Sequence, residues 1–172
     1  MKLRYFNSEY LRAMDPARFA EIAEPYIRKA VPNPDIDAKA IAPLLQQRCE
    51  VLTEIPEKIA FFEALPDYDL ALYSNKKNKL NPEASLELLH AVRPRFEALE
   101  EWTPDSVLGV LSGLAQERDM KIGKVMWPVR ISVSGQAVTP GGPVEICTIL
   151  GKEESLRRMD AGIKMLEEGA QA

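Results

Sequence analysis

Histidine and cysteine are nearly absent from the sequence. His90 is the only histidine, and Cys49 and Cys147 lie far apart, with no CxxC motif. A histidine-based zinc site or a Ser/His/Asp triad therefore has almost no residues from which to be built. Two isolated cysteines without neighbouring metal ligands indicate reduced thiols in a cytoplasmic protein.

Long apolar runs are also missing. No stretch approaches the ~18 consecutive apolar residues of a membrane span, and the N-terminus has no signal-peptide pattern. We therefore expect a cytoplasmic protein with no membrane partner. The chain has 172 residues, of which 46% are hydrophobic and 28% charged. These values are typical of a soluble globular protein with one ordinary domain or two small ones.

A net positive charge is lacking, since the formal net charge is −4. This argues mildly against a generic nucleic-acid binder, which is usually basic overall. The charge is nevertheless segregated along the chain. Lys76, Lys77 and Lys79 have no acid between them, and the segment 121–150 carries three basic residues against Glu145 alone. A local basic face for a shape-specific RNA ligand is therefore compatible with the composition.

Prolines are the main helix punctuation. Asp15, Asn81 and Thr103 are each followed by proline, the pattern of an N-cap residue with proline at the first helical position. Apolar residues at three- and four-residue spacing follow each pair and predict helices. Further helices are expected from Asp37 to Leu52, from Thr53 to about Leu65, and from about Lys152 to Gly169. We expect a kink or break at Pro25 and Pro94, and a connector over 67–79.

The segment 128–135 is ambiguous. Ile131 and Val133 alternate as in a strand, whereas Pro128 is also compatible with the first position of a helix. Residue patterns alone leave both structures open.

Two features indicate a site. In the segment 121–150, Lys121, Lys124 and Arg130 surround Trp127, which we expect to be exposed, and the turn Thr139-Pro140-Gly141-Gly142-Pro143 follows. Cations bind phosphate, an aromatic ring stacks on a base, and glycine permits close backbone approach, which are the requirements for holding a single-stranded RNA loop. The alternative is a charged surface helix followed by a tight turn.

Arg48 is the second feature. Between Asp37 and Leu52 it falls at helical spacing among apolar residues, where it must pair, extend to solvent or reach a ligand. A salt bridge to a neighbouring glutamate is the structural alternative.

The chain resembles the C-terminal, tRNA-binding half of bacterial glutamyl-tRNA synthetase, a class I aminoacyl-tRNA synthetase. The resemblance covers nearly the whole chain and includes Tyr5-Phe6-Asn7-Ser8-Glu9-Tyr10-Leu11 and the segment 48–57. Its most specific part is an ordered set of motifs: Lys121-Ile-Gly-Lys, Pro128-Val-Arg-Ile-Ser-Val-Ser-Gly135, Thr139-Pro-Gly and Leu150-Gly-Lys-Glu.

The resemblance implies an all-α, multihelical anticodon-binding region with two subdomains. Residues 1–66 would contact the stem and residues 67–172 the anticodon loop of tRNA(Glu), and we expect a monomer. It also favours a helix over 128–135. The expected RNA-binding residues are Arg48, Lys76, Lys77, Lys79, Lys121, Lys124, Trp127, Arg130, Thr139, Pro140 and Gly141. Arg48 would read the third anticodon base. Ser112, Trp127 and the longer Gly141-Gly142-Pro143 turn depart from some relatives, so individual base contacts stay open.

The catalytic signatures of that family are missing. Neither a HIGH-type ATP motif nor a KMSKS-type loop occurs, and Gly151-Lys152-Glu153 is not a P-loop. We therefore expect no catalytic residue and no cofactor in this chain, which would be the tRNA-reading fragment of a longer enzyme that uses ATP and magnesium. A helical protein-interaction module without nucleic-acid binding is the alternative function.

Overall fold

The computed structural model describes residues 2–171, except for the side chains of Lys2, Arg4, Tyr5 and Phe6. Within this range every regular element is helical, and the only β-type pairing is an isolated bridge between Asn75 and Leu80. The predicted all-α class is confirmed. The chain divides into two compact units, Met1–Ala64 and Leu65–Ala172. None of the described helices is long and apolar enough to cross a membrane.

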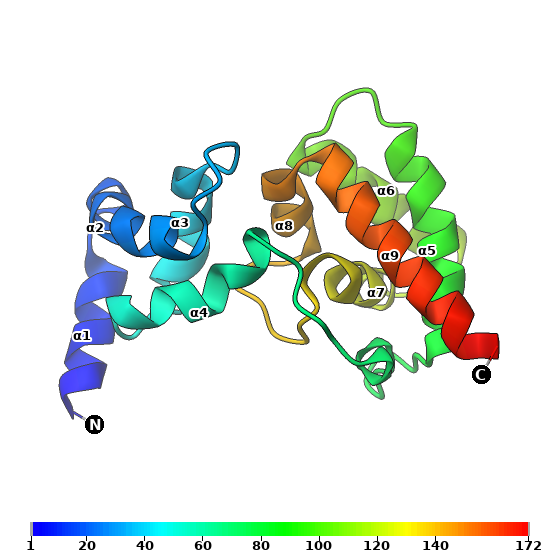
Figure 1. Ribbon diagram of the computed structural model, residues 1–172, viewed down its shortest axis with the longest axis horizontal. Coiled ribbons are helices and arrows are strands. Elements are labelled where there is room, and N and C mark those ends of the chain that lie inside the picture. The colour runs from blue at the N-terminus through cyan, green and yellow to red at the C-terminus, as the bar shows by residue number, and fades with distance from the viewer. Residues whose placement is uncertain (1, 172) are drawn as a thin grey trace. The chain divides into compact units, whose positions relative to one another are not determined.

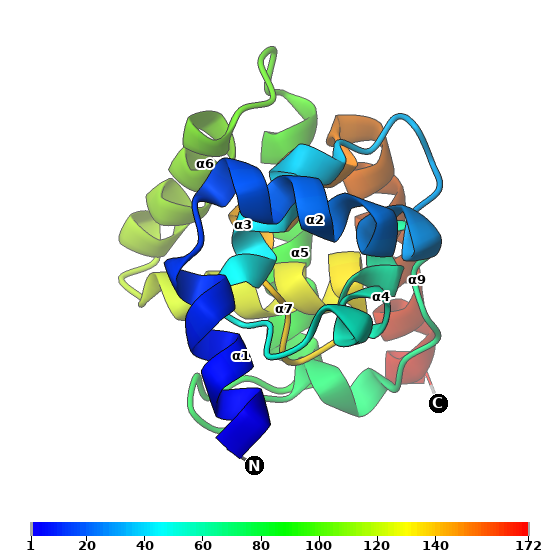
Figure 2. The ribbon, with the colours of Figure 1, turned by 90° about the vertical axis from the view of Figure 1, so that its left-hand side faces the viewer.

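The first unit contains helices α1 (Lys2–Ala13), α2 (Pro16–Ala30), α3 (Ala38–Gln46) and α4 (Ile55–Ile59), with the 3-10 turns η1 (Leu52–Glu54) and η2 (Ala60–Phe62) flanking α4. Helix α2 packs on α3 and α4 (Figure 2). It runs through Pro25 without ending. Asp37 caps α3 by accepting a hydrogen bond from the Lys39 amide at 2.9 Å. The core of this unit is formed by Phe19, Ala23, Ile27, Ile41, Leu45, Ile55, Ile59, Phe61 and Phe62.

The second unit contains the 3-10 turn η3 (Leu70–Tyr73) and helices α5 (Pro82–Glu97), α6 (Pro104–Glu117), α7 (Ile122–Ser134), α8 (Pro143–Leu150) and α9 (Lys152–Gln171). Helices α5 and α9 lie side by side (Figure 1) and are joined by Arg93, whose guanidinium donates to both Asp160 carboxylate oxygens at 2.8 and 3.0 Å. Two of the three predicted caps are present: Asn81 and Thr103 accept hydrogen bonds from the amides of Ala84 and Ser106. Asp15 stands at the N-cap position of α2, but within the described residues its side chain makes no capping hydrogen bond.

Helix α7 is the centre of the second unit, in contact with α5, α6, α8, α9 and η3. It includes Pro128–Ser134, so the helical prediction for this stretch is confirmed, although Pro128 lies inside the helix and not at its first position. Ile131 and Val133 are fully buried, and Gly135 ends the helix with φ of 67°. Burial on several sides stabilises the β-branched residues in a helix, against their local preference for strand.

Candidate nucleic-acid interface

The three lysines of the connector lie on a turn with fixed backbone. Asn75 and Leu80 exchange both backbone hydrogen bonds, at 3.0 and 2.9 Å, and the Asn78 amide donates to Asn75 Oδ1 at 2.9 Å. The backbone of Lys79 adopts the left-handed conformation, with φ of 54°. Lys76, Lys77 and Lys79 are all exposed on this turn.

This turn lies beside the N-terminus of α7. A Cβ atom added at Gly123 would stand 3.5 Å from Asn78 Oδ1, which places the turn against the first turn of the helix. Lys121 is the exposed N-cap residue of α7, and Lys124 lies one turn further. The fold thus brings Lys76, Lys77, Lys79, Lys121 and Lys124 into one neighbourhood, which we name the lysine cluster.

Trp127 is not the exposed ring that the sequence suggested. It is partly buried, and its Nε1 donates a hydrogen bond to the Leu72 carbonyl at 2.9 Å. A buried indole usually finds a partner for its N–H group, and the partner here belongs to η3. The sequence predicted a surface tryptophan because Lys124 and Arg130 lie three residues on either side of it, and it gives no sign of the segment that packs on the ring.

Arg130 and the turn 139–141 occupy the other end of α7. Arg130 lies in the last turns of the helix and is partly buried. Thr139 Oγ1 donates to the Gly141 carbonyl at 2.7 Å, and Gly141 has φ of 79°. Pro140, between them, restricts the backbone further. The glycine is required by this conformation, because side chains strain a residue in the left-handed region.

The sequence-based position of Arg48 on an apolar helix face is wrong. Helix α3 ends at Gln46, the Arg48 amide donates to the Leu45 carbonyl at 2.9 Å, and Arg48 is exposed after the helix. Among the described residues Arg48 forms no ion pair with Glu54. One Glu54 carboxylate oxygen instead accepts from the amides of Glu50 and Val51, at 2.5 and 3.0 Å. This carboxylate closes the turn, so the periodic apolar spacing does not continue as helix.

A family model described as an anticodon binding domain matches residues 18–163. The chain belongs to this family of anticodon-binding domains. Two glutamate–tRNA ligases, from Clostridium botulinum strain Loch Maree and Lachnoclostridium phytofermentans, are 46% and 47% identical to it. Each alignment covers 96% of this chain and 34% of the relative. The chain therefore spans about a third of the length of the curated relatives it matches, and the resemblance found in the sequence is confirmed.

Solved structures agree with this anticodon-binding domain at the level of the fold. A glutamate tRNA ligase from Elizabethkingia meningosepticum superposes with a TM-score of 0.77 at 23% identity, over 95% of this chain and 32% of that chain. A glutamate-tRNA synthetase from Elizabethkingia anophelis gives 0.70 at 22% identity, over 94% and 31%.

Sequence reasoning missed the group that supports the end of α7 in this anticodon-binding domain. Arg158 of α9 is 1% exposed, and its Nη1 donates to the Val133 carbonyl at 2.7 Å. Its Nε donates to Glu154 at 2.8 Å. Burial lowers the pKa of Arg158, while the Glu154 carboxylate opposes that shift. The signal in the sequence was Glu154 four residues before Arg158, a spacing that also occurs on solvated helix faces.

Helix α8 was missed too, because the proline after Gly142 was assigned to the turn. Pro143 is instead at the start of the helix, and Glu145 accepts a hydrogen bond from the Gly142 amide at 3.0 Å. The start of α8 therefore fixes the backbone at the end of the turn 139–142.

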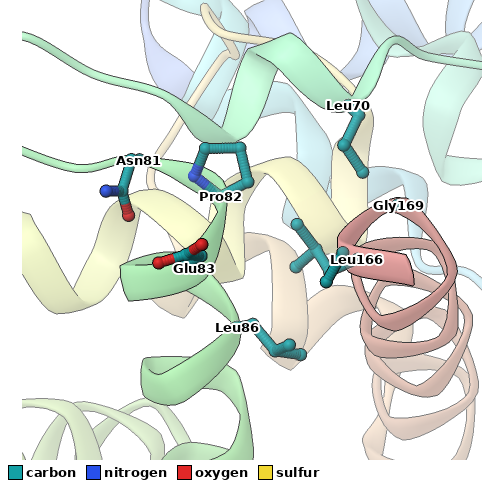
Figure 3. A pocket seen from close by; sticks show the side chains of 8 residues that line it. Leu70, Asn81, Pro82, Glu83, Leu86, Leu166 and Gly169 are labelled. Atoms are coloured by element: carbon teal, nitrogen blue, oxygen red, sulfur yellow. The ribbon is translucent and has the colours of Figure 1, made fainter. Parts of the chain in front are cut away.

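Two cavities of the second unit have none of the predicted RNA-binding residues in their lining. One of about 350 Å³ is lined by Leu70, by Asn81, Pro82, Glu83 and Leu86 from the start of α5, and by Leu166, Gly169 and Ala170 of α9 (Figure 3). Its few polar groups include no general base paired with a nucleophile. Within the described residues no three His, Cys, Asp or Glu side chains gather as a metal site.

Proposed function

We propose that this chain is the anticodon-arm-binding part of a glutamate–tRNA ligase, the C-terminal portion that reads tRNA(Glu). The observation that carries the proposal is identity of 46% to such ligases along 96% of the chain. The catalytic residues, ATP and magnesium would belong to the rest of the enzyme, since the chain spans only 34% of such a ligase. The activity would be joining glutamate to that tRNA.

The chemistry of the surface supports this proposal. The lysine cluster supplies five cations and Arg130 supplies a planar donor for phosphate or a base edge. The turn Thr139, Pro140 and Gly141 offers backbone groups where a splayed nucleotide approaches closely. Arg48, exposed in the first unit, would add a contact to the third anticodon base.

A protein-interaction module is the competing function, and binding measurements separate the two. We expect the chain to bind glutamate tRNA with an affinity that falls linearly with the logarithm of salt concentration, because phosphate contacts release counterions. Glutamine tRNA and an unrelated tRNA serve as competitors. Equal retention of all three at every salt concentration, or no retention of any, contradicts the proposal.

A further inference from the structure

We propose that the lysine cluster binds the phosphodiester backbone of RNA without base selectivity, and that Trp127 positions the lysine-bearing turn and does not stack on a base. This inference rests on the proposed function. It assigns separate tasks to the two ends of α7: backbone binding at the N-terminus, and base contacts near Arg130 and the turn 139–141.

The cluster is fixed before any ligand arrives. Reciprocal backbone bonds between Asn75 and Leu80 close the turn, and the bond from the Asn78 amide to the Asn75 side chain braces its interior. A ligand therefore meets lysine Cα atoms that are already ordered, so less backbone entropy is lost on binding. The long lysine side chains remain free to follow an irregular line of phosphates.

Two contacts hold the turn against α7. Asn78 lies next to Gly123, and the Trp127 indole N–H donates to the Leu72 carbonyl, three residues before the turn begins. An indole whose N–H edge is bonded to backbone has lost the freedom to adjust to a base. Its visible role is to keep η3, and with it Lys76, Lys77 and Lys79, beside Lys121 and Lys124.

Among the described residues the lysine cluster also has no ion-pair partner. The sequence from Leu70 to Pro82 contains no acid, the first turn of α7 contains none, and the nearest acid before the helix is Asp119. In the part of the chain that the structure describes, none of the five lysines takes part in an ion pair. Arg93, Arg95 and Arg158 of the same unit all pair with carboxylates. Adjacent unpaired cations repel one another, and a polyanion relieves that repulsion.

The surroundings favour RNA over an acidic protein. Protein interfaces are centred on aromatic or apolar anchors. The large exposed apolar residues of the described part of this unit are Leu108 and Val138, which lie on α6 and in the loop before α8. Neither belongs to the turn 75–80 or the start of α7. Lysine, a compact charge without a planar fork, suits phosphate contacts that carry no sequence information.

The test removes the three charges of the turn. The variant Lys76→Gln/Lys77→Gln/Lys79→Gln is compared with Lys29→Gln/Lys39→Gln/Lys164→Gln, which loses the same charge from exposed lysines on three separate helices. The salt slope of tRNA binding should fall by about 2 in the first variant and stay near that of the unaltered chain in the second. If the turn variant and the unaltered chain bind equally well near ~1 M salt, a slope difference of about 2 makes the variant bind about 100-fold more weakly at ~0.1 M.

The loss should be the same for glutamate tRNA, glutamine tRNA and an unrelated tRNA, because the contacts are to backbone. A turn variant that binds like its control overturns the inference and leaves the proposed function standing. A loss confined to one tRNA also overturns it, because the cluster would then read bases. If the unaltered chain binds no tRNA, the proposed function and this inference fail together.

Trp127→Phe separates positioning from stacking, since phenylalanine keeps a flat ring and loses the N–H donor. Positioning predicts faster hydrogen exchange at the Leu80 and Asn78 amides, which are bonded within the turn, and weaker binding of every tRNA by a common factor. Unchanged exchange together with unchanged binding contradicts the positioning role of Trp127.

Discussion

At the scale of single residues, Arg158 shows how one buried cation supports a surface that it never reaches. It satisfies the Val133 carbonyl in the last turn of α7 and pairs with Glu154, while its own side chain is 1% exposed. Arg130 stands three residues before Val133 on the same helix. The orientation of a proposed RNA contact therefore depends on a residue of α9.

We expect Arg158→Ala to lower the free energy of unfolding of the second unit by about 3 kcal/mol, because a buried carbonyl and a carboxylate lose their donor. Arg157→Ala is a matched control: Arg157 pairs with the same Glu154 but is 63% exposed, so its removal should cost at most about 1 kcal/mol. Urea unfolding followed by circular dichroism measures both. Equal losses of unfolding free energy in the two variants would show that the buried contact of Arg158 adds no stability beyond that of an exposed ion pair.

Glu154 predicts a pH dependence. Hydrogen bonds from Arg157, and then from Arg158, lower its pKa from 4.5 to about 2. In the unfolded chain the carboxylate takes up its proton near the ordinary pKa, so protonation favours unfolding between about pH 4.5 and pH 2. The stabilisation from this group is complete above that window and is lost as the pH falls through it.

The corresponding measurement is the urea midpoint of the unaltered chain and of Glu154→Gln at about pH 6 and at about pH 2. At the higher pH the unaltered chain should have the higher urea midpoint of the two proteins. The difference between the two midpoints should shrink at the lower pH. A constant difference would mean that the carboxylate is not held in its charged form by the two arginines.

At the scale of elements, the crossing of α7 and α9 depends on a glycine. A Cβ atom at Gly162 would lie 2.5 Å from Tyr73 Oη and 3.1 Å from Ser132 Cβ. The Tyr73 hydroxyl cannot move away easily, because it is buried and lies 2.7 Å from the Tyr68 hydroxyl. The two helices can approach this closely only without a side chain between them.

Gly162→Ala should therefore destabilise the second unit by about 1–3 kcal/mol through overpacking, although alanine is the better helix former. Gly113→Ala provides the opposite case: the glycine is exposed on α6 and an added Cβ meets nothing within 4 Å. There the change should stabilise by up to about 1 kcal/mol. Thermal unfolding of the two variants should shift in opposite directions, and a shared direction would contradict the packing account.

The elements show which parts of the fold are encoded locally. Asn81-Pro82 and Thr103-Pro104 predicted α5 and α6 because their caps are short-range hydrogen bonds. The end of α3 before Arg48 was not predicted, since it depends on Glu54 reaching back to two amides. The helical state of Ile131 and Val133 could not be read from their propensity, because it is imposed by the helices packed around α7. The partial burial of Trp127 likewise depends on η3, which is distant in the sequence.

At the scale of the whole molecule, the proposed RNA contacts are divided between two compact units. Arg48 belongs to the first, and the lysine cluster, Arg130 and the turn 139–141 belong to the second. From the sequence, these residues were predicted to share one function only through resemblance to a family, since no local pattern links positions so far apart.

Arg48 gives the sharpest prediction at this scale. Its side chain is exposed and lies outside α3, so Arg48→Gln should leave the unfolding midpoint nearly unchanged. A planar guanidinium donates two parallel hydrogen bonds to an acceptor-rich base edge, whereas a glutamine amide offers one donor face and one acceptor and tolerates more than one base. Glutamate and glutamine tRNAs differ at the third anticodon base. We therefore expect Arg48→Gln to narrow the preference for glutamate tRNA over glutamine tRNA in a binding competition.

The turn variant Lys76→Gln/Lys77→Gln/Lys79→Gln is the control, because it should weaken the binding of both tRNAs and preserve the ratio of their affinities. If Arg48→Gln also weakens both alike, Arg48 contacts backbone and the discrimination must come from the second unit.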